Sequence, residues 1–365
     1  MLDRYHLKVV QIAPTAAGPH GPDAPEDDYA VPRAARAAAG DINASLALAR
    51  RIGPTAPLPG RGRTHDRWKL LATLAASDLT VARVIEPHLD ALAILDEAAH
   101  AELPAPSPRA GSLWGVFAGE GPEPTVTVGR SSDGSLRLSG VKPWCGLADR
   151  LTDALVTATT DDGQSVLVAV NLRAPGVTVE PGEPVRARVP YVVPDVPGGP
   201  IRFDDVPAVT IGPPGWYVDR RGFWWGGIGL AACWYGGSVG LARAAWQQVH
   251  RRRSTDVPHV ELARIDLALH TTRTALADAA VTVDDPRTPA QDLPLLAQRV
   301  RAVAADGAEV VLREAGHLLK PGPVALDTEQ ARRVADMTVY IRQHPAERDL
   351  AGLSSSLAGG DRPPW

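Results

Sequence analysis

The chain has 365 residues, a net charge of −4 and a sequence pI near 6.2. Its 44% hydrophobic and 22% charged residues are typical of a packed globular protein, and its length suggests roughly two to three domains. The acidic balance argues against a nucleic-acid partner or a membrane-surface role for the whole protein. Its two cysteines, Cys145 and Cys233, form no CxxC pair, so we expect lone thiols in a reducing cytosol and no metal site.

The apolar segments of the chain predict neither a signal peptide nor a membrane span. The stretch from Met1 to Gln11 has no apolar core, so no signal peptide is expected and a cytoplasmic location is predicted. Residues 222–240 are apolar but interrupted by Gly and rich in Trp, which predicts a buried helix rather than a membrane span. The motifs GxxxxGK[ST], HExxH and GxSxG are absent, as is a GxGxxG that opens a helix. P-loop NTPases, Rossmann dehydrogenases, zincins and α/β-hydrolases are therefore not expected.

The first part of the chain is predicted to be helical. Residues 29–103 are rich in Ala and Leu, and apolar residues recur at helical spacing in 70–84 and 90–95. Pro54, Pro57 and Pro59 mark a loop in this region. We expect an N-terminal helical domain over residues 1–112.

Short strands with turns between them are predicted from residue 113 to residue 212. The turn sequences Ser132-Asp133-Gly134-Ser135 and Asp161-Asp162-Gly163 each separate two apolar runs, which predicts two hairpins. The expected strands cover residues 125–128, 136–138, 154–158, 165–170, 177–179 and 201–203. This pattern indicates an all-β module.

The last part of the chain, residues 213–365, returns to helical periodicity. The expected helices cover residues 228–249, 260–280, 295–312 and 330–343. Four long helices in succession predict a four-helix bundle. The fold class is therefore multi-domain α+β, with helices on both sides of the β module in the sequence.

This order resembles the acyl-CoA dehydrogenase architecture, in which a small β-barrel stands between a helical domain and a four-helix bundle. Four local sequences agree with the resemblance, which covers residues 70–350. LSGVKPWC (138–145) is similar to the family's LNGxKxWIT, GVFAGEG (115–121) to GAFALTEPG, FDDVP (203–207) to FxxVxVP, and EAGH (314–317) falls where the family has an LHGG loop between its last two helices.

The resemblance implies an FAD between the barrel and the bundle, whose tail reaches another subunit of a homodimer or homotetramer. Trp144 would then stack near the isoalloxazine; the alternative is a core Trp of the barrel. Cys145 would lie beside the flavin, or it is a buried inert thiol. Gly146 follows it where relatives carry a hydroxyl.

Further cofactor contacts follow from the same resemblance. Gly119 replaces the family's Thr before Glu120, so backbone N–H groups would have to bind the flavin carbonyls. Arg253 fits the family's pyrophosphate-binding Arg by its spacing before Pro258, or it belongs to a solvated helix end. Gly316 would let a phosphate or adenine approach the backbone, or it simply ends a helix.

The expected catalytic base is missing. The family uses a Glu after the last bundle helix, and that position falls on His344; a second family position falls on Leu230 and Ala231. Two replacements stay open, a displaced Glu347 or His344 itself. Pro345 should end the helix at His344, where the negative end of the helix dipole would favour imidazolium.

Three functions follow. The family default is dehydrogenation of the CH–CH bond of an acyl thioester, with α-proton abstraction, hydride transfer to flavin and a separate electron acceptor. The second is oxygenation of a small metabolite by a flavin monooxygenase of the same fold, served by a flavin reductase. The third is a degenerate subunit that binds a partner or ligand without turnover, which the missing hydroxyls and the missing Glu favour.

Overall fold

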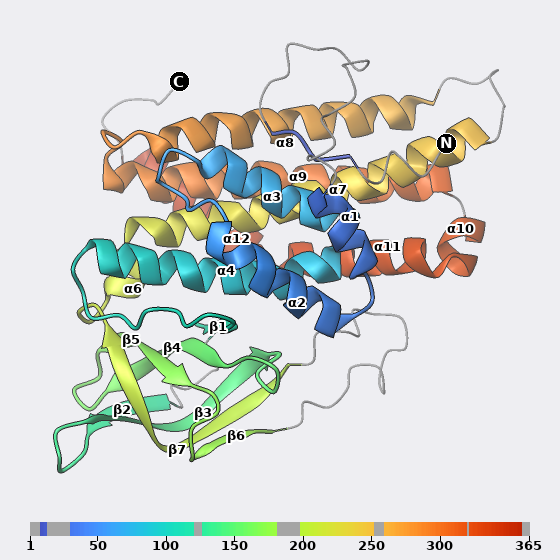
Figure 1. Ribbon diagram of the computed structural model, residues 1–365. Coiled ribbons are helices and arrows are strands. Elements are labelled where there is room, and N and C mark those ends of the chain that lie inside the picture. Colours follow the sequence, from blue (N-terminus) through green and yellow to red (C-terminus); the bar gives the residue numbers. More distant parts are fainter. Residues whose placement is uncertain are drawn as a thin grey trace.

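The computed structural model describes residues 8–12, 30–119, 126–180, 198–251, 259–319 and 321–359. The helices pack into one body, and a small sheet lies against one side of it (Figure 1). The helices at the two ends of the chain pack together, while the strands in the middle of the chain form the separate β region. The structure thus confirms the predicted α+β order; the domain boundaries at residues 112 and 212 stay a prediction.

The N-terminal helices are α1 (Ala30–Ala37), α2 (Ile42–Ile52), α3 (Thr64–Ser77) and α4 (Leu79–His100), with a short 3-10 turn at Gly53–Thr55. The prediction of helices here is confirmed. Asp78 separates α3 from α4, and its side chain accepts a hydrogen bond from the Val81 N–H at 3.0 Å. This N-cap lets α4 begin with a single residue between it and α3.

The sheet contains β1 (Trp114–Phe117), β2 (Val126–Arg130), β3 (Leu136–Gly146), β4 (Asp153–Thr160), β5 (Ser165–Asn171), β6 (Val177–Val179) and β7 (Gly198–Ile211). β2–β3 and β4–β5 are antiparallel neighbours, so both predicted hairpins are confirmed. Among the described strands the pairings run β4-β2-β3-β7-β5 and return to β4, while β1 and β6 pair outside this ring. The ring leaves β1 at its rim, against the helices.

A buried histidine fastens β1 to α4. The Trp114 N–H donates to Nδ1 of His88 at 3.2 Å. Burial lowers the pKa of His88 to about 4, so the ring is neutral and this nitrogen can accept a hydrogen bond. β1 therefore has a fixed position on α4.

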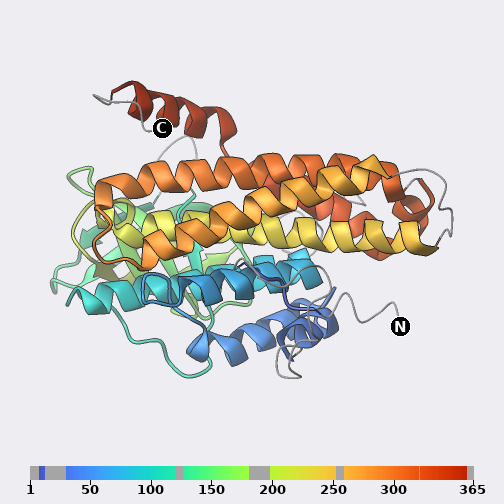
Figure 2. The ribbon, with the colours of Figure 1, turned by 90° about the horizontal axis from the view of Figure 1, so that it is seen from above.

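The C-terminal helices are α6 (Trp216–Asp219), α7 (Arg221–Arg251), α8 (Val260–Asp284), α9 (Leu293–Leu319), α10 (Pro321–Leu326), α11 (Thr328–Tyr340) and α12 (Ala346–Ala358), with 3-10 turns at Ala290–Asp292 and Ile341–Gln343. α7, α8, α9 and α11 are the four predicted helices. α7, α8 and α9 run side by side, and α12 lies outside α9 (Figure 2).

The glycines of α7 allow it to lie directly on α3. A Cβ at Gly236 would approach the Ala72 carbonyl oxygen to 2.2 Å, so only glycine permits this approach. The prediction of a buried helix over residues 222–240 is confirmed. Within the described residues, no helix is both long and apolar enough to cross a membrane.

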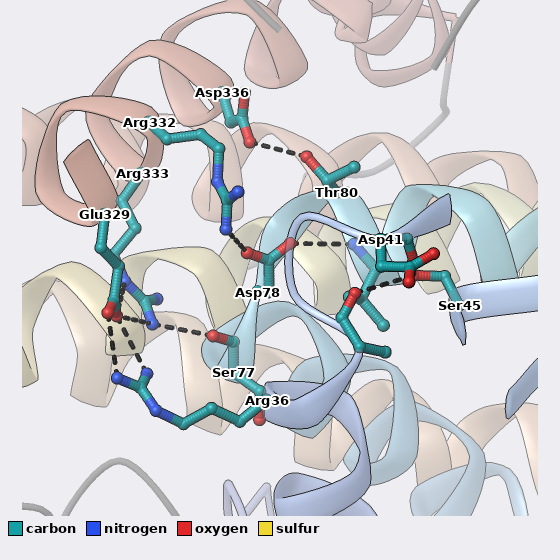
Figure 3. A network of polar contacts seen from close by, with 12 residues as sticks. Arg36, Asp41, Ser45, Ser77, Asp78, Thr80, Glu329, Arg332, Arg333 and Asp336 are labelled. Atoms are coloured by element: carbon teal, nitrogen blue, oxygen red, sulfur yellow. Dashed lines mark hydrogen bonds and ion pairs between the residues drawn. The ribbon is translucent and has the colours of Figure 1, made fainter. Parts of the chain in front are cut away.

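A polar network joins α11 to the N-terminal helices (Figure 3). Glu329 accepts from both Arg36 and Arg333, at 2.9 Å and 3.0 Å. Arg333 also donates to the carbonyls of Ala76 and Ser77, at 3.0 Å and 2.8 Å. Each buried donor has an acceptor, so the end of α3 and the start of α11 are fixed to each other.

Candidate functional site

A cavity of about 230 Å³ opens between the rim of the sheet and the helices. Its wall combines α4, β1, the end of β3 and the end of α11. The described residues that line it are Arg83, Val84, Glu86, Pro87, Trp114, Gly115, Val116, Phe117, Trp144, Gly146, Leu147, Leu151, Tyr340 and Gln343. Segments that are distant in the sequence thus come together at this cavity and line it with both aromatic and charged side chains.

Trp144 is presented to this cavity by an irregularity in β3. The register of β3 against β7 shifts between Lys142 and Cys145, and Trp144 adopts a φ of 55°. A bulky residue at positive φ is rare and costs energy, and here 74% of the residue is left exposed. The alternative that Trp144 belongs to the barrel core is therefore wrong.

The neighbouring Cys145 points the other way. It is 1% exposed, and its thiol donates to the Lys142 carbonyl at 3.3 Å. Burial raises the pKa of the thiol to about 12, which makes it an inert thiol under ordinary conditions. Lys142 is buried as well, and its Nζ donates to the Thr157 hydroxyl at 2.8 Å. These contacts hold the backbone that presents Trp144.

Of the other expected cofactor residues, the structure describes Gly119 and Gly316. Gly119 is exposed just after β1, and Glu120 and Arg253 lie outside the described residues. Gly316 lies inside α9, so the expectation of a loop at residues 314–317 is wrong. It does not end the helix, and a Cβ there would meet nothing within 4 Å. Gly316 is exposed, and no neighbouring atom occupies the space that a side chain would fill.

His344 follows the 3-10 turn at the end of α11 in an extended conformation, so Pro345 ends the helix as predicted. Its side chain is 4% exposed, with its ring 5.8 Å from that of Trp234 and Nδ1 3.4 Å from Asp349. Burial lowers its pKa, and the Arg301 guanidinium lowers it further. The expected imidazolium is thus disfavoured, because burial outweighs the helix dipole. His344 does not line the cavity.

Glu347 is exposed in the first turn of α12 and does not line the cavity either. The cavity is instead reached from this part of the chain by Tyr340 and Gln343. Leu230, at the family's second base position, is an apolar side chain of α7 packed against the core. No carboxylate is therefore brought to the described cavity wall from either position.

Two charged residues of α4, which none of the sequence motifs singled out, also line the cavity. Glu86 is the sole carboxylate among the described lining residues. Burial and the nearby Asp90 together raise the pKa of its carboxyl to about 8, against the opposing effect of Arg67. The Arg83 guanidinium lies 5.2 Å from the Tyr340 ring, and its Nη1 is buried without a hydrogen-bond partner among the described residues. The available signal was the i,i+4 pair Glu86 and Asp90 in an apolar helix.

A second cavity, of about 290 Å³, lies further along α4 beside the start of α7. Asp90 and Glu97 line it from α4, and Arg220 lines it from the residue before α7. Arg220 and Glu97 form an ion pair at 2.8 Å, with the Arg220 side chain 3% exposed. Glu86 and Asp90 thus line different cavities from one helix.

No protein-family model matches the chain, and no curated protein matches it significantly. Solved structures do match. KijD3 in complex with FMN and a dTDP-sugar is 18% identical with a TM-score of 0.72, and the match covers 95% of this chain and 97% of that one. FMN-bound TdsC from Paenibacillus sp. A11-2, a dibenzothiophene monooxygenase, is 16% identical with a TM-score of 0.73, over 92% and 97%.

Butyryl-CoA dehydrogenase from Megasphaera elsdenii is 15% identical with a TM-score of 0.71, and the match covers 93% of this chain and 100% of the other. At these identities the likeness establishes the fold. The resemblance inferred from the order of elements and from four short sequences is confirmed at that level. The chain has an acyl-CoA dehydrogenase-like fold, which it shares with flavin-containing monooxygenases.

Proposed function

We propose that the protein is a flavin-dependent oxidoreductase that acts on a small molecule in the cavity beside Trp144. The observation that carries the proposal is Trp144 itself, an exposed indole held at positive φ over a cavity. Such strain and exposure are costly in a residue without a ligand. KijD3 and TdsC contain FMN, which supports a flavin; FAD is our prediction for this chain.

The described residues fit a flavin ring. Trp144, Phe117 and Leu147 give the cavity an apolar wall, and the backbone of β1 offers peptide groups beside it. A planar ring can stack on the indole while backbone N–H groups bind its carbonyl oxygens. When bound, a flavin supplies two-electron transfer and reaction with O₂. The protein would position the substrate and move protons.

Oxygenation is the reaction that the geometry favours. α-Proton abstraction as the family performs it needs a carboxylate from α7 or from the segment after α11, and neither presents one to the described cavity wall. His344 and Glu347, the two expected replacements, also lie outside the described wall. Monooxygenation of a small metabolite, with electrons from a flavin reductase, has no need of that base.

Dehydrogenation of an acyl thioester is the second candidate. It is favoured by Glu86, a carboxylate that lines the cavity from α4 and becomes a base once deprotonated. An electron acceptor, the homodimer or homotetramer and the cytoplasmic location stay predictions from the sequence.

The test is purification with FAD or FMN, followed by two mixing experiments. We expect bound flavin, O₂ uptake when a reductase and NADH supply reduced flavin, and no anaerobic bleaching by butyryl-CoA. Bleaching by butyryl-CoA would establish dehydrogenation instead. Failure to bind either flavin would contradict both enzymatic functions and favour the degenerate binding subunit.

A further inference from the structure

Glu86 occupies the point at which the cavity meets the protein interior. It lines the cavity together with Trp144 and Tyr340, and burial and neighbouring charges, rather than hydrogen bonds from described residues, set its pKa. α3, α4, α6, α7 and the end of α11 all contribute a titratable or charged group to its surroundings. These groups are Arg67, Arg83, Asp90, Tyr217, Cys233 and Tyr340.

We propose that Glu86 is the acid–base group of this cavity and donates the proton that the departing oxygen of O₂ needs. The inference rests on the proposed function and adds to it a catalytic residue. Oxygenation needs no base at the two positions where the resemblance places one, but it does need a proton donor. The proton-transferring group has come from α4 instead.

The stoichiometry of oxygenation requires this proton. One oxygen atom of O₂ joins the substrate and the other leaves as water, while two electrons and one proton come from the anionic reduced flavin supplied by a reductase. One further proton must reach the departing oxygen. Glu86 supplies it, becomes a carboxylate, and takes up a proton from solvent before the next turnover.

The surroundings keep this proton in place at neutral pH. Burial disfavours the carboxylate, and the Asp90 charge disfavours it further, so the pKa of Glu86 is raised to about 8. The Arg67 guanidinium opposes both effects without cancelling them. Asp90 is half-buried and lines the second cavity. We assign it as a positioning residue that raises the proton affinity of Glu86.

The experiment uses flavin-loaded protein, reduced anaerobically and mixed with O₂, with the return of oxidised-flavin absorbance as readout. Without substrate the reduced flavin passes two electrons and a proton to O₂, and one further proton completes H₂O₂. For the native protein we expect the rate to fall as the pH rises through about 8. Glu86→Gln should slow the step about 100-fold at neutral pH and remove this pH dependence. Asp96→Asn, on the same helix but paired with exposed Arg61, is the matched control and should leave rate and profile unchanged.

Asp90→Asn gives a second, independent readout. Removal of the neighbouring charge lowers the proton affinity of Glu86, so the midpoint of the pH profile should move to lower pH. An unchanged rate and profile in Glu86→Gln that still binds flavin would overturn the inference and leave the proposed function standing. A rate that rises with pH through the same midpoint would assign Glu86 as a base and overturn its role as proton donor. Absence of flavin binding in the native protein would instead overturn the proposed function.

Discussion

Two half-buried carboxylates of this protein have opposite environments. Glu329 on α11 accepts hydrogen bonds from Arg36 and Arg333, which hold its pKa down to about 2 in spite of burial. Glu86 on α4 has Arg67 nearby, but burial and the neighbouring Asp90 outweigh it and raise the pKa of Glu86 to about 8. The polar groups around Glu329 bind one another (Figure 3), whereas Glu86 lines a cavity.

The difference separates charges that stabilise the fold from charges available for chemistry. A carboxylate with two guanidinium partners stays ionised and fixed, so it can neither release nor take up a proton near neutral pH. A carboxyl group desolvated beside another acid titrates in the range where enzymes use protons. We therefore expect substitutions in the Glu329 network to change stability and substitutions in the cavity wall to change flavin chemistry.

Arg333→Leu tests the network side and should have the largest effect on stability. It leaves the carbonyls of Ala76 and Ser77 without their donor and removes one partner of Glu329, at a cost of about 2–3 kcal/mol. Urea unfolding measures this loss. Arg342→Leu, which breaks an exposed pair with Glu309, is the control and should cost less than about 0.5 kcal/mol. If the folded Arg333→Leu variant bound flavin with a different affinity, this would contradict the separation between charges that stabilise the fold and charges that line the cavity.

Trp144→Ala tests the cavity side. Loss of the indole wall should weaken flavin binding at least about tenfold, measured by fluorescence titration, because stacking contributes on the order of 1 kcal/mol or more. Stability should change by less than about 0.5 kcal/mol, since the side chain is exposed. Trp144→Phe keeps a flat ring and should retain most of the affinity. Equal affinity in the Ala variant would show that the flavin does not lie on Trp144.

Glu86→Gln should change the pH dependence of the folding stability. A carboxyl whose pKa is raised on folding binds its proton more tightly in the folded state, so its contribution to stability is lost as pH rises from about 4.5 to 8. The amide removes this loss. At pH 9 the variant should be more stable than the native protein by at least about 1 kcal/mol in thermal or urea unfolding. Equal stability at pH 9 would show that Glu86 is not buried as a charge.

Two glycine substitutions on the helices should change stability in opposite directions. Gly316→Ala should stabilise by about 0.5–1 kcal/mol, because the exposed position in α9 has room for a Cβ. Gly236→Ala should destabilise by about 1–3 kcal/mol, because its Cβ would press on the Ala72 carbonyl. Thermal unfolding measures both. Loss of flavin affinity in Gly316→Ala would support the cofactor contact that the sequence suggested.

The sequence by itself predicted the order of elements well because its signals are local. The turn at Asp133-Gly134 fixes the β2–β3 hairpin, the apolar periodicity of residues 260–280 indicates α8, and Pro345 ends the segment after α11. Each depends on backbone preferences within a few residues. The resemblance to the acyl-CoA dehydrogenases also followed from order and short motifs, and it directed attention to Trp144, which the structure leaves exposed beside a cavity.

Which charged groups face the cavity depends on how the elements pack. Desolvation and neighbouring charges depend on side chains that are distant in the sequence, such as Arg67 and Tyr340 around Glu86. A pattern centred on the family's base position pointed to His344, which the fold buries against Trp234 instead. The sequence determined the elements because hydrogen bonding and turn chemistry are local; burial, which sets proton affinity, is a property of the packed molecule.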